Sequence, residues 1–321
     1  MFVILLTRLF VVSTLFASSL SLDCKPLTKT FTVDQSGNGD YKTIQSAMNS
    51  VPHKNDQWLK FHIRAGTYLE KVSVLPDKGC VILEGEGREK TIISWDDHSD
   101  TDSTYTFEAT CENFVATQIS FVNSYNLKSN EANRTVAPAL AVSLGGDKHA
   151  FYQCGFFGYQ DTIHDDEGRH YFKECYIEGA VDFIYGAGQS FYEKCDINAT
   201  GYGYITAQGR EAQTDTNGFV FEGCNVFGLG PTYLGRAYRA WSRVIYHSCT
   251  IDVDVMPLGW DAWNQVGKES NLDYVESDCK GAHYDTSKRI PWLKNFTSTQ
   301  LADFTRDKFI NQDGWIEKQP N

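Results

Sequence analysis

A cysteine recurs along this chain in a fixed local setting. In each copy an aromatic residue lies three positions before the cysteine, and an apolar residue lies two positions after it. Successive cysteines are 21, 20, 29 and 25 residues apart, so a constant core alternates with connections of unequal length. The copies occupy residues 151–156, 172–177, 192–197, 221–226 and 246–251.

A repeat of this kind restricts the fold. Short strands joined by turns of unequal length fit the spacings. Helical repeats would need longer segments with a 3.6-residue period, and the chain is instead rich in glycine, β-branched and aromatic residues. We therefore predict an all-β chain, a right-handed parallel β-helix whose stacked turns bury a ladder of apolar residues and cysteines. A β-sandwich with coincidental cysteine spacing is the alternative.

The segments flanking the repeats are expected to complete this solenoid. Residues 31–52 hold a turn-rich stretch and then a short amphipathic helix, which we expect to cap the open N-terminal end. Strands are predicted from residues 59–63 to about Asp252. The tail from Lys288 is expected to lie along the outside as one helix and an extended segment, with apolar positions at Leu301, Phe304, Phe309 and Ile310.

Residues 1–22 have the pattern of a secretory signal peptide, with Arg8, an apolar run at 9–16 and then small residues. Its removal would change the net charge from −12 to about −13, because Arg8 leaves and no acidic residue does. The acidic charge argues against a nucleic-acid partner, and no later segment is apolar enough to span a membrane. The sequons at Asn133, Asn198 and Asn295 fit secretion.

With 321 residues, of which 41% are apolar, the chain has material for one large core. No linker is apparent, so residues 23–321 are predicted to form a single domain. The nine cysteines leave two interpretations open, namely disulfides, as in other exported proteins, or free stacked thiols inside the ladder. The chain has no C-x-x-C pair and its eight histidines are scattered, so we expect no metal site.

Two acidic motifs lie within the repeats. The motifs are Gly-Tyr-Gln-Asp-Thr at 158–162 and Val-Asp-Phe-Ile-Tyr-Gly at 181–186. Their aspartates, Asp161 and Asp182, are 21 residues apart, which is also the spacing of the two preceding cysteines. On successive turns of a solenoid, these carboxylates would stack about 4.8 Å apart. Two carboxylates so close do not both ionise easily, so one is expected to keep its proton near neutral pH. An acid beside a nucleophile indicates an enzyme.

Five motifs occur along the chain, namely Gly-Thr-Tyr-Leu-Glu at 66–70, Gly-Tyr-Gln-Asp-Thr at 158–162, Asp-Phe-Ile-Tyr-Gly at 182–186, Leu-Gly-Arg at 234–236, and Pro-Leu-Gly-Trp at 257–260 with Trp263. Taken together, they resemble the plant pectinesterases (pectin methylesterases) that lack a pro-region. The resemblance implies a right-handed β-helix that hydrolyses methyl esters of galacturonic acid in cell-wall pectin, without a metal or organic cofactor. It also implies an extracellular monomer, with a proteinaceous pectinesterase inhibitor as a second candidate partner.

Carried over residue by residue, the resemblance implies roles for four polar side chains. Asp182 resembles the nucleophile, and Arg236 resembles the arginine that keeps this carboxylate ionised and oriented. Asp161 resembles the general acid, which later acts as the base on water. Gln160 resembles an amide donor of the oxyanion hole.

Four further residues are candidate substrate contacts. Thr106 aligns with a substrate-contacting threonine when residues are counted back from Phe121 and Asn123. Tyr159, Tyr185 and Tyr238 are expected to offer ring faces to the apolar sides of sugar rings.

The chain departs from the family pattern at two places. Pro138 occupies the position of a glutamine that supplies the second oxyanion donor, and proline has neither a side-chain donor nor a backbone N–H. Leu-Gly-Arg is followed by Ala237 and Tyr238 instead of Pro and Trp. A catalytically weak or inactive pectin-binding relative therefore stays as a second hypothesis. A polygalacturonase or pectate lyase is the third, although the chain has no Gly-His-Gly or Asn-Thr-Asp motif and no obvious calcium-binding acidic set.

Overall fold

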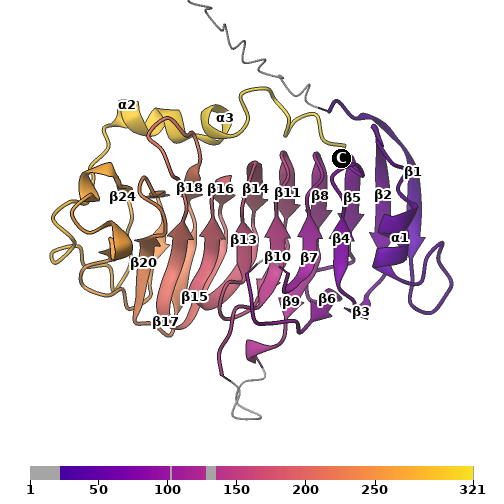
Figure 1. The fold of residues 1–321 in the computed structure, drawn as a ribbon, viewed down its shortest axis with the longest axis horizontal. Helices are drawn as coiled ribbons and strands as arrows, with labels where there is room; N and C mark the ends of the chain where they lie inside the picture. Colours follow the sequence, from indigo (N-terminus) through magenta and orange to yellow (C-terminus); the bar gives the residue numbers. More distant parts are fainter. Residues whose placement is uncertain (1–21, 102, 128–134, 321) are drawn as a thin grey trace, which may run out of the picture.

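The computed structural model describes residues 22–101, 103–127 and 135–320. These residues form a parallel β-helix with few helices, as the repeat predicts (Figure 1). All but the last residue of the expected signal peptide, and the sequon asparagine Asn133, lie outside the described residues.

One face of the solenoid is sheet A, a ten-stranded sheet in which every neighbouring pair of strands is parallel. Its strands follow the chain order, so each turn adds one strand beside the last (Figure 1). They are β1 (Lys25–Val33), β2 (Gln57–Ile63), β5 (Val81–Glu84), β8 (Phe114–Thr117), β11 (His149–Tyr152), β14 (Arg169–Lys173), β16 (Gln189–Glu193), β18 (Gly218–Glu222), β21 (Arg243–His247) and β24 (Asp273–Ser277).

The other strands belong to sheet B, which consists of two columns joined by the long strands β15 (Tyr176–Gly186) and β17 (Asp196–Gln208). The first halves of these strands continue one column, and their second halves continue the other. The first column also holds β3 (Gly66–Leu69), β6 (Thr91–Trp95), β9 (Ser120–Asn123), β12 (Gly155–Phe157), β19 (Asn225–Gly228) and β22 (Thr250–Ile251), and the second holds β4 (Val72–Val74), β7 (Tyr105–Ala109), β10 (Leu140–Leu144), β13 (Ile163–Asp165), β20 (Thr232–Ala237) and β23 (Trp260–Asp261).

The repeat marks the bend between sheet A and the first column. The residue before each cysteine has a left-handed backbone, with φ between 52° and 62°, so the chain turns sharply there. The aromatic residues of successive copies stack inside the solenoid with ring centroids 4.5 to 5.0 Å apart. The aromatic residue and the cysteine therefore form two parallel ladders in the core. The left-handed residues are Gln153, Glu174, Lys194, Gly223, Ser248 and Asp278.

The structure settles the two interpretations of the cysteines, because both occur. Cys24 and Cys80 form a disulfide, and the other seven cysteines are free. Cys279, which is free, adds a sixth copy to the ladder. It lies on the turn after that of Cys249, because the following residues, Lys280 and Thr250, form a β-bridge. Sequence analysis missed this copy because Glu276 stands where the other copies have an aromatic residue.

The solenoid has more strands than predicted. They begin at Lys25 instead of residue 59 and end at Ser277 instead of Asp252, because edge turns with weaker sequence patterns still pair with their neighbours. The expected N-terminal helix is α1 (Ile44–Ser50), capped by the Thr43 side chain and placed at the N-terminal end of the solenoid (Figure 1). Its residues Ile44, Ala47 and Met48 enter the core.

The C-terminal segment covers the outer face of sheet A, as predicted, but the expectation of one helix is wrong. Two short helices, α2 (Ser298–Leu301) and α3 (Arg306–Phe309), are separated by a 3-10 turn and by Thr305, whose extended backbone interrupts the helix. Phe309 and Ile310 join the apolar cluster on the outer face of sheet A. None of the helices in the described ranges is long and apolar enough to cross a membrane. The 3-10 helices are Trp263–Gln265, Glu269–Asn271 and Ala302–Phe304.

Candidate active site

Asp161 and Asp182 lie at equivalent places on successive turns, as their 21-residue offset predicts. Asp161 connects β12 with β13, and Asp182 lies within β15. A β-bridge pairs Gln160 with Val181, and the Asp161 N–H donates to the Val181 carbonyl at 3.0 Å. Both aspartates have a left-handed backbone, with φ of 62° and 49°, a conformation that aspartate tolerates better than most residues.

The two carboxyl groups are buried, with 5% of Asp161 and 8% of Asp182 exposed. Burial and then the neighbouring Asp182 carboxylate raise the pKa of Asp161 to about 7, against the opposing effects of Arg236 and a hydrogen bond from Gln160. Asp161 therefore holds a proton over most of the acidic and near-neutral range, as a general acid must.

Arg236 clamps Asp182. From β20, its Nε donates to Oδ1 at 2.7 Å and its Nη2 donates to Oδ2 at 2.5 Å, a bidentate pair between residues 54 positions apart. Burial lowers the pKa of Arg236, but the hydrogen bonds and charge of Asp182 raise it above its ordinary value. Two parallel charge-assisted hydrogen bonds fix the orientation of the Asp182 carboxylate.

Aromatic rings surround the Arg236 guanidinium. Its Cζ lies 3.9 Å from the ring centroid of Trp263, 5.6 Å from that of Tyr204 and 5.7 Å from that of Tyr238. Such rings attract a cation through their negative faces. Tyr238 and Trp263 therefore both lie beside Arg236, and Trp263 is the nearer of the two.

The other predicted side chains differ in placement. Gln160 contacts Asp161 through its side chain. The Tyr185 ring, 7% exposed, stacks on His164 with centroids 4.5 Å apart and lines a cavity of about 310 Å³ together with Tyr238. Tyr159 is half-buried.

Thr106 is not brought to the surface of this site. Its side chain is fully buried, and its hydroxyl donates to the Val122 carbonyl at 2.9 Å, within the wall of the solenoid. Pro138 is half-buried on the turn before Gln160, and the adjacent Ala139 N–H donates to the Gln160 carbonyl at 3.3 Å.

A match to the pectinesterase family model covers residues 30–313. The chain belongs to the pectinesterase family. It is 45% identical over 297 residues to Probable pectinesterase 55 of Arabidopsis thaliana, with 90% of each chain covered, and 44% identical to Probable pectinesterase 29 of that plant, covering 90% of this chain and 89% of the relative.

Solved structures agree with this assignment. A pectin methylesterase from carrot superposes with a TM-score of 0.83 at 30% identity, covering 91% of this chain and 96% of the carrot chain. A pectin methylesterase from Aspergillus niger has a TM-score of 0.77 at 26% identity, with 92% and 95% covered. As a pectinesterase, the chain is a carboxylic ester hydrolase.

Sequence analysis missed three residues at the site of this pectinesterase, His164, Tyr204 and Asp261. His164 was detectable, because it precedes Tyr185 by the same 21 residues that separate the two aspartates, and the two are register partners. Tyr204 and Asp261 meet through a 2.9 Å hydrogen bond across 57 residues, and no repeat signals this contact.

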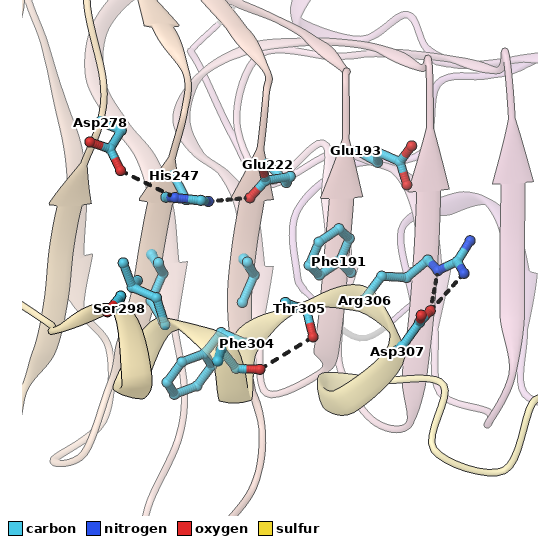
Figure 2. Close-up of a pocket in the computed structure, with 14 residues that line it drawn as sticks. Phe191, Glu193, Glu222, His247, Asp278, Ser298, Phe304, Thr305, Arg306 and Asp307 are labelled. Atoms are coloured by element: carbon cyan, nitrogen blue, oxygen red, sulfur yellow. Dashed lines mark hydrogen bonds and ion pairs between the residues drawn. The ribbon is translucent and has the colours of Figure 1, made fainter.

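A cavity of about 580 Å³ lies elsewhere, between sheet A and the C-terminal helices (Figure 2). Five of its charged side chains already pair with one another, with His247 between Glu222 at 2.6 Å and Asp278 at 3.4 Å, and Arg306 on Asp307 at 2.6 Å. The sixth, Glu193, accepts a hydrogen bond from the Tyr171 hydroxyl at 2.6 Å. The pectinesterase motifs contribute none of its lining residues. Among the described residues, no cluster of three or more His, Cys, Asp or Glu side chains is arranged to hold a metal ion.

Proposed function

We propose that this chain hydrolyses methyl esters of galacturonosyl residues in cell-wall pectin and releases methanol. The observation that carries the proposal is the pairing of two unlike carboxyl groups. Asp161 has its pKa raised to about 7, whereas Asp182 is held by a bidentate arginine. A carboxyl group that holds its proton, beside a second one oriented by an arginine, provides an acid and a nucleophile in one site.

In the proposed reaction, a carboxylate oxygen of Asp182 attacks the ester carbonyl carbon. Gln160 donates a hydrogen bond to the oxygen that gains charge. The bond from carbon to the methoxy oxygen then breaks, and Asp161 gives its proton to the leaving methanol. Water, deprotonated by the Asp161 carboxylate, attacks the acyl-enzyme, so that the acid product leaves and both aspartates return to their starting states.

The test is methanol release from methyl-esterified pectin by the purified chain and by its Asp182→Asn variant. We expect the variant to fold and to lose ester hydrolysis, because asparagine has the volume of aspartate without its nucleophilic oxygen. Asp196→Asn is a matched control, since Asp196 begins β17 and contacts Asn225 at 3.3 Å instead of the site. Near wild-type turnover by Asp182→Asn would refute the mechanism.

Pro138 supports the second candidate, a weak or inactive pectin-binding protein. Its ring leaves the site without the second amide donor of the family pattern, and one such donor is worth about a hundred- to a thousandfold in rate. Measurable binding to esterified pectin without methanol release would favour this candidate.

We also propose that the protein acts as a monomer outside the cell, after loss of residues 1–22, and that a proteinaceous pectinesterase inhibitor binds it. Of the two sequon asparagines within the described ranges, Asn295 is exposed, whereas the Asn198 amide donates to the Tyr176 hydroxyl at 2.8 Å. Glycosylation is therefore expected first at Asn295. Secretion from plant cells, N-terminal sequencing and size-exclusion chromatography with and without inhibitor test these points.

A further inference from the structure

The third nitrogen of Arg236 has no hydrogen bond. Nε and Nη2 both bond Asp182, whereas Nη1 is buried and has no hydrogen-bond partner among the described residues. Beyond Asp182, aromatic rings therefore hold the guanidinium, and Trp263 lies nearest at 3.9 Å. The position of such a cation is only as well defined as the positions of its rings.

Asp261 holds two of these rings at once. It is the register partner of Arg236 on the next turn. Its Oδ1 accepts the backbone N–H of Trp263 at 2.7 Å, and its Oδ2 accepts the hydroxyl of Tyr204 at 2.9 Å. Trp263 has a left-handed backbone with φ of 47°, which is unfavourable for a residue other than glycine, so its turn needs such support.

Tyr204 and Trp263 each also stack on a further tyrosine ring. Tyr204 stacks on Tyr233 with centroids 5.0 Å apart, and Trp263 stacks on Tyr238 with centroids 6.0 Å apart. Burial and then the hydrogen bond to Asp261 raise the pKa of Tyr204, so its hydroxyl remains a donor. The Asp261 carboxylate thus fixes the positions of both Tyr204 and Trp263, the two rings that pack on the Arg236 guanidinium.

We propose that Asp261 is a positioning residue for Arg236, acting through Tyr204 and Trp263. This inference rests on the proposed function, in which Arg236 orients the Asp182 carboxylate for attack. Without Asp261 the two rings move, the bidentate pair is broken part of the time, and fewer molecules hold a competent nucleophile. The titratable groups that face or act on Arg236 include Asp161, Asp182, Tyr204, Tyr238 and Tyr274.

The kinetic test compares Asp261→Ala, Asp261→Asn and Tyr204→Phe in methanol release from about pH 4 to about pH 9. For Asp261→Ala we expect kcat to fall about ten- to a hundredfold, the effect of a misplacement of roughly 1 Å, with a smaller change in KM. Asp261→Asn, which keeps an acceptor for Trp263, is expected to recover part of the loss, and Tyr204→Phe to lose less than Asp261→Ala.

Asp34→Ala is the matched control for loss of a turn. Asp34 Oδ1 accepts the Ser36 N–H at 2.8 Å, the same two-residue geometry as in Asp261, but directly after β1 at the opposite end of the solenoid (Figure 1). We expect it to change the melting temperature alone. A wild-type kcat in Asp261→Ala would overturn the proposal.

A second measurement does not depend on activity. With nitrogen-15 arginine, the Arg236 Nε–H is assigned as the signal absent from Arg236→Lys, and its hydrogen exchange is followed by NMR. We expect faster exchange in Asp261→Ala than in wild type. A wild type that releases no methanol would refute the proposed function while this measurement still reports on Asp261. An active wild type with unchanged exchange in Asp261→Ala would refute the positioning role instead.

Discussion

At the scale of single residues, Asp161, the proposed general acid, lowers the free energy of unfolding at neutral and alkaline pH. Asp161 is 5% exposed, and its pKa is raised from an ordinary value near 3.8 to about 7. Between these two values the folded protein binds more protons than the unfolded chain, so stability falls as the pH rises through this range. Above about pH 7 the full penalty of a buried, charged carboxylate remains.

Asp161→Asn is therefore expected to stabilise the protein at pH 8 while it abolishes proton donation. The gain has an upper bound on the order of 4 kcal/mol, from about three pKa units. It should vanish well below the ordinary value of 3.8, where the carboxyl is protonated in both states. Chemical denaturation at several pH values measures it. An Asp161→Asn variant that is less stable than wild type at pH 8 would show that this carboxyl is not held against its charge.

Pro138→Gln tests whether the oxyanion hole lacks a donor. If no other group has taken over that contact, kcat should rise by up to about a hundred- to a thousandfold, because the hydrogen bond strengthens as the carbonyl oxygen gains charge. Kinetics and melting temperature are measured together, so that a misfolded variant is recognised. A folded variant with unchanged or lower kcat would mean that the chain completes its oxyanion hole another way.

The sequence predicts those site residues whose places the repeat determines. Asp161 and Asp182 follow from the shared offset of motif and cysteine, and the bond from Arg236 to Asp182 agrees with the family motif. Thr106 was placed by counting across turns of unequal length, and it lies inside the wall. Asp261 was beyond reach, because its role depends on a left-handed turn and on a contact with Tyr204 from a different turn.

At the scale of elements, the bend before each cysteine recurs with different residues. At five of the six positions immediately before a ladder cysteine, a residue other than glycine has the left-handed conformation. Among the six, only Gly223 adopts it without strain. The backbone N–H at these bends still pairs with the next turn, as Lys194 does with the Glu222 carbonyl at 2.9 Å. Stacking therefore imposes the conformation on residues that do not prefer it, which is why the spacings predicted the turns but not their backbone angles.

Lys194 is a suitable place to measure this strain, because its side chain is exposed and its φ is 52°. We expect Lys194→Gly to stabilise the protein by about 0.5–1 kcal/mol, as relief of left-handed strain exceeds the entropy that glycine gains in the unfolded chain. Lys194→Val should destabilise it by 1 kcal/mol or more, on the order of a β-branched outlier. Urea midpoints compare the two. Equal midpoints would mean that the bends carry no strain.

At the scale of the whole molecule, net charge acts on the polymer. The chain has 41 acidic and 29 basic residues, and the product of de-esterification is an anion. Repulsion is therefore expected to weaken retention on de-esterified pectin relative to methyl-rich pectin, most clearly at low ionic strength. Binding to pectins of graded esterification, at low and high salt, measures the difference. Tight, salt-sensitive binding to fully de-esterified pectin would contradict it.

The unequal spacing of the cysteines has a consequence for how such a chain changes over generations. Turns of 20 and 29 residues share one six-residue core, so the extra residues leave the stack on the outside. An insertion or deletion in a connecting loop leaves every neighbouring pair in register. A single residue inserted between Tyr192 and Cys195 would instead turn one of these two side chains from the core to the outside, since alternate residues of a strand face opposite sides. Mutations can thus change the length of the loops around the site step by step while the stacked core stays the same.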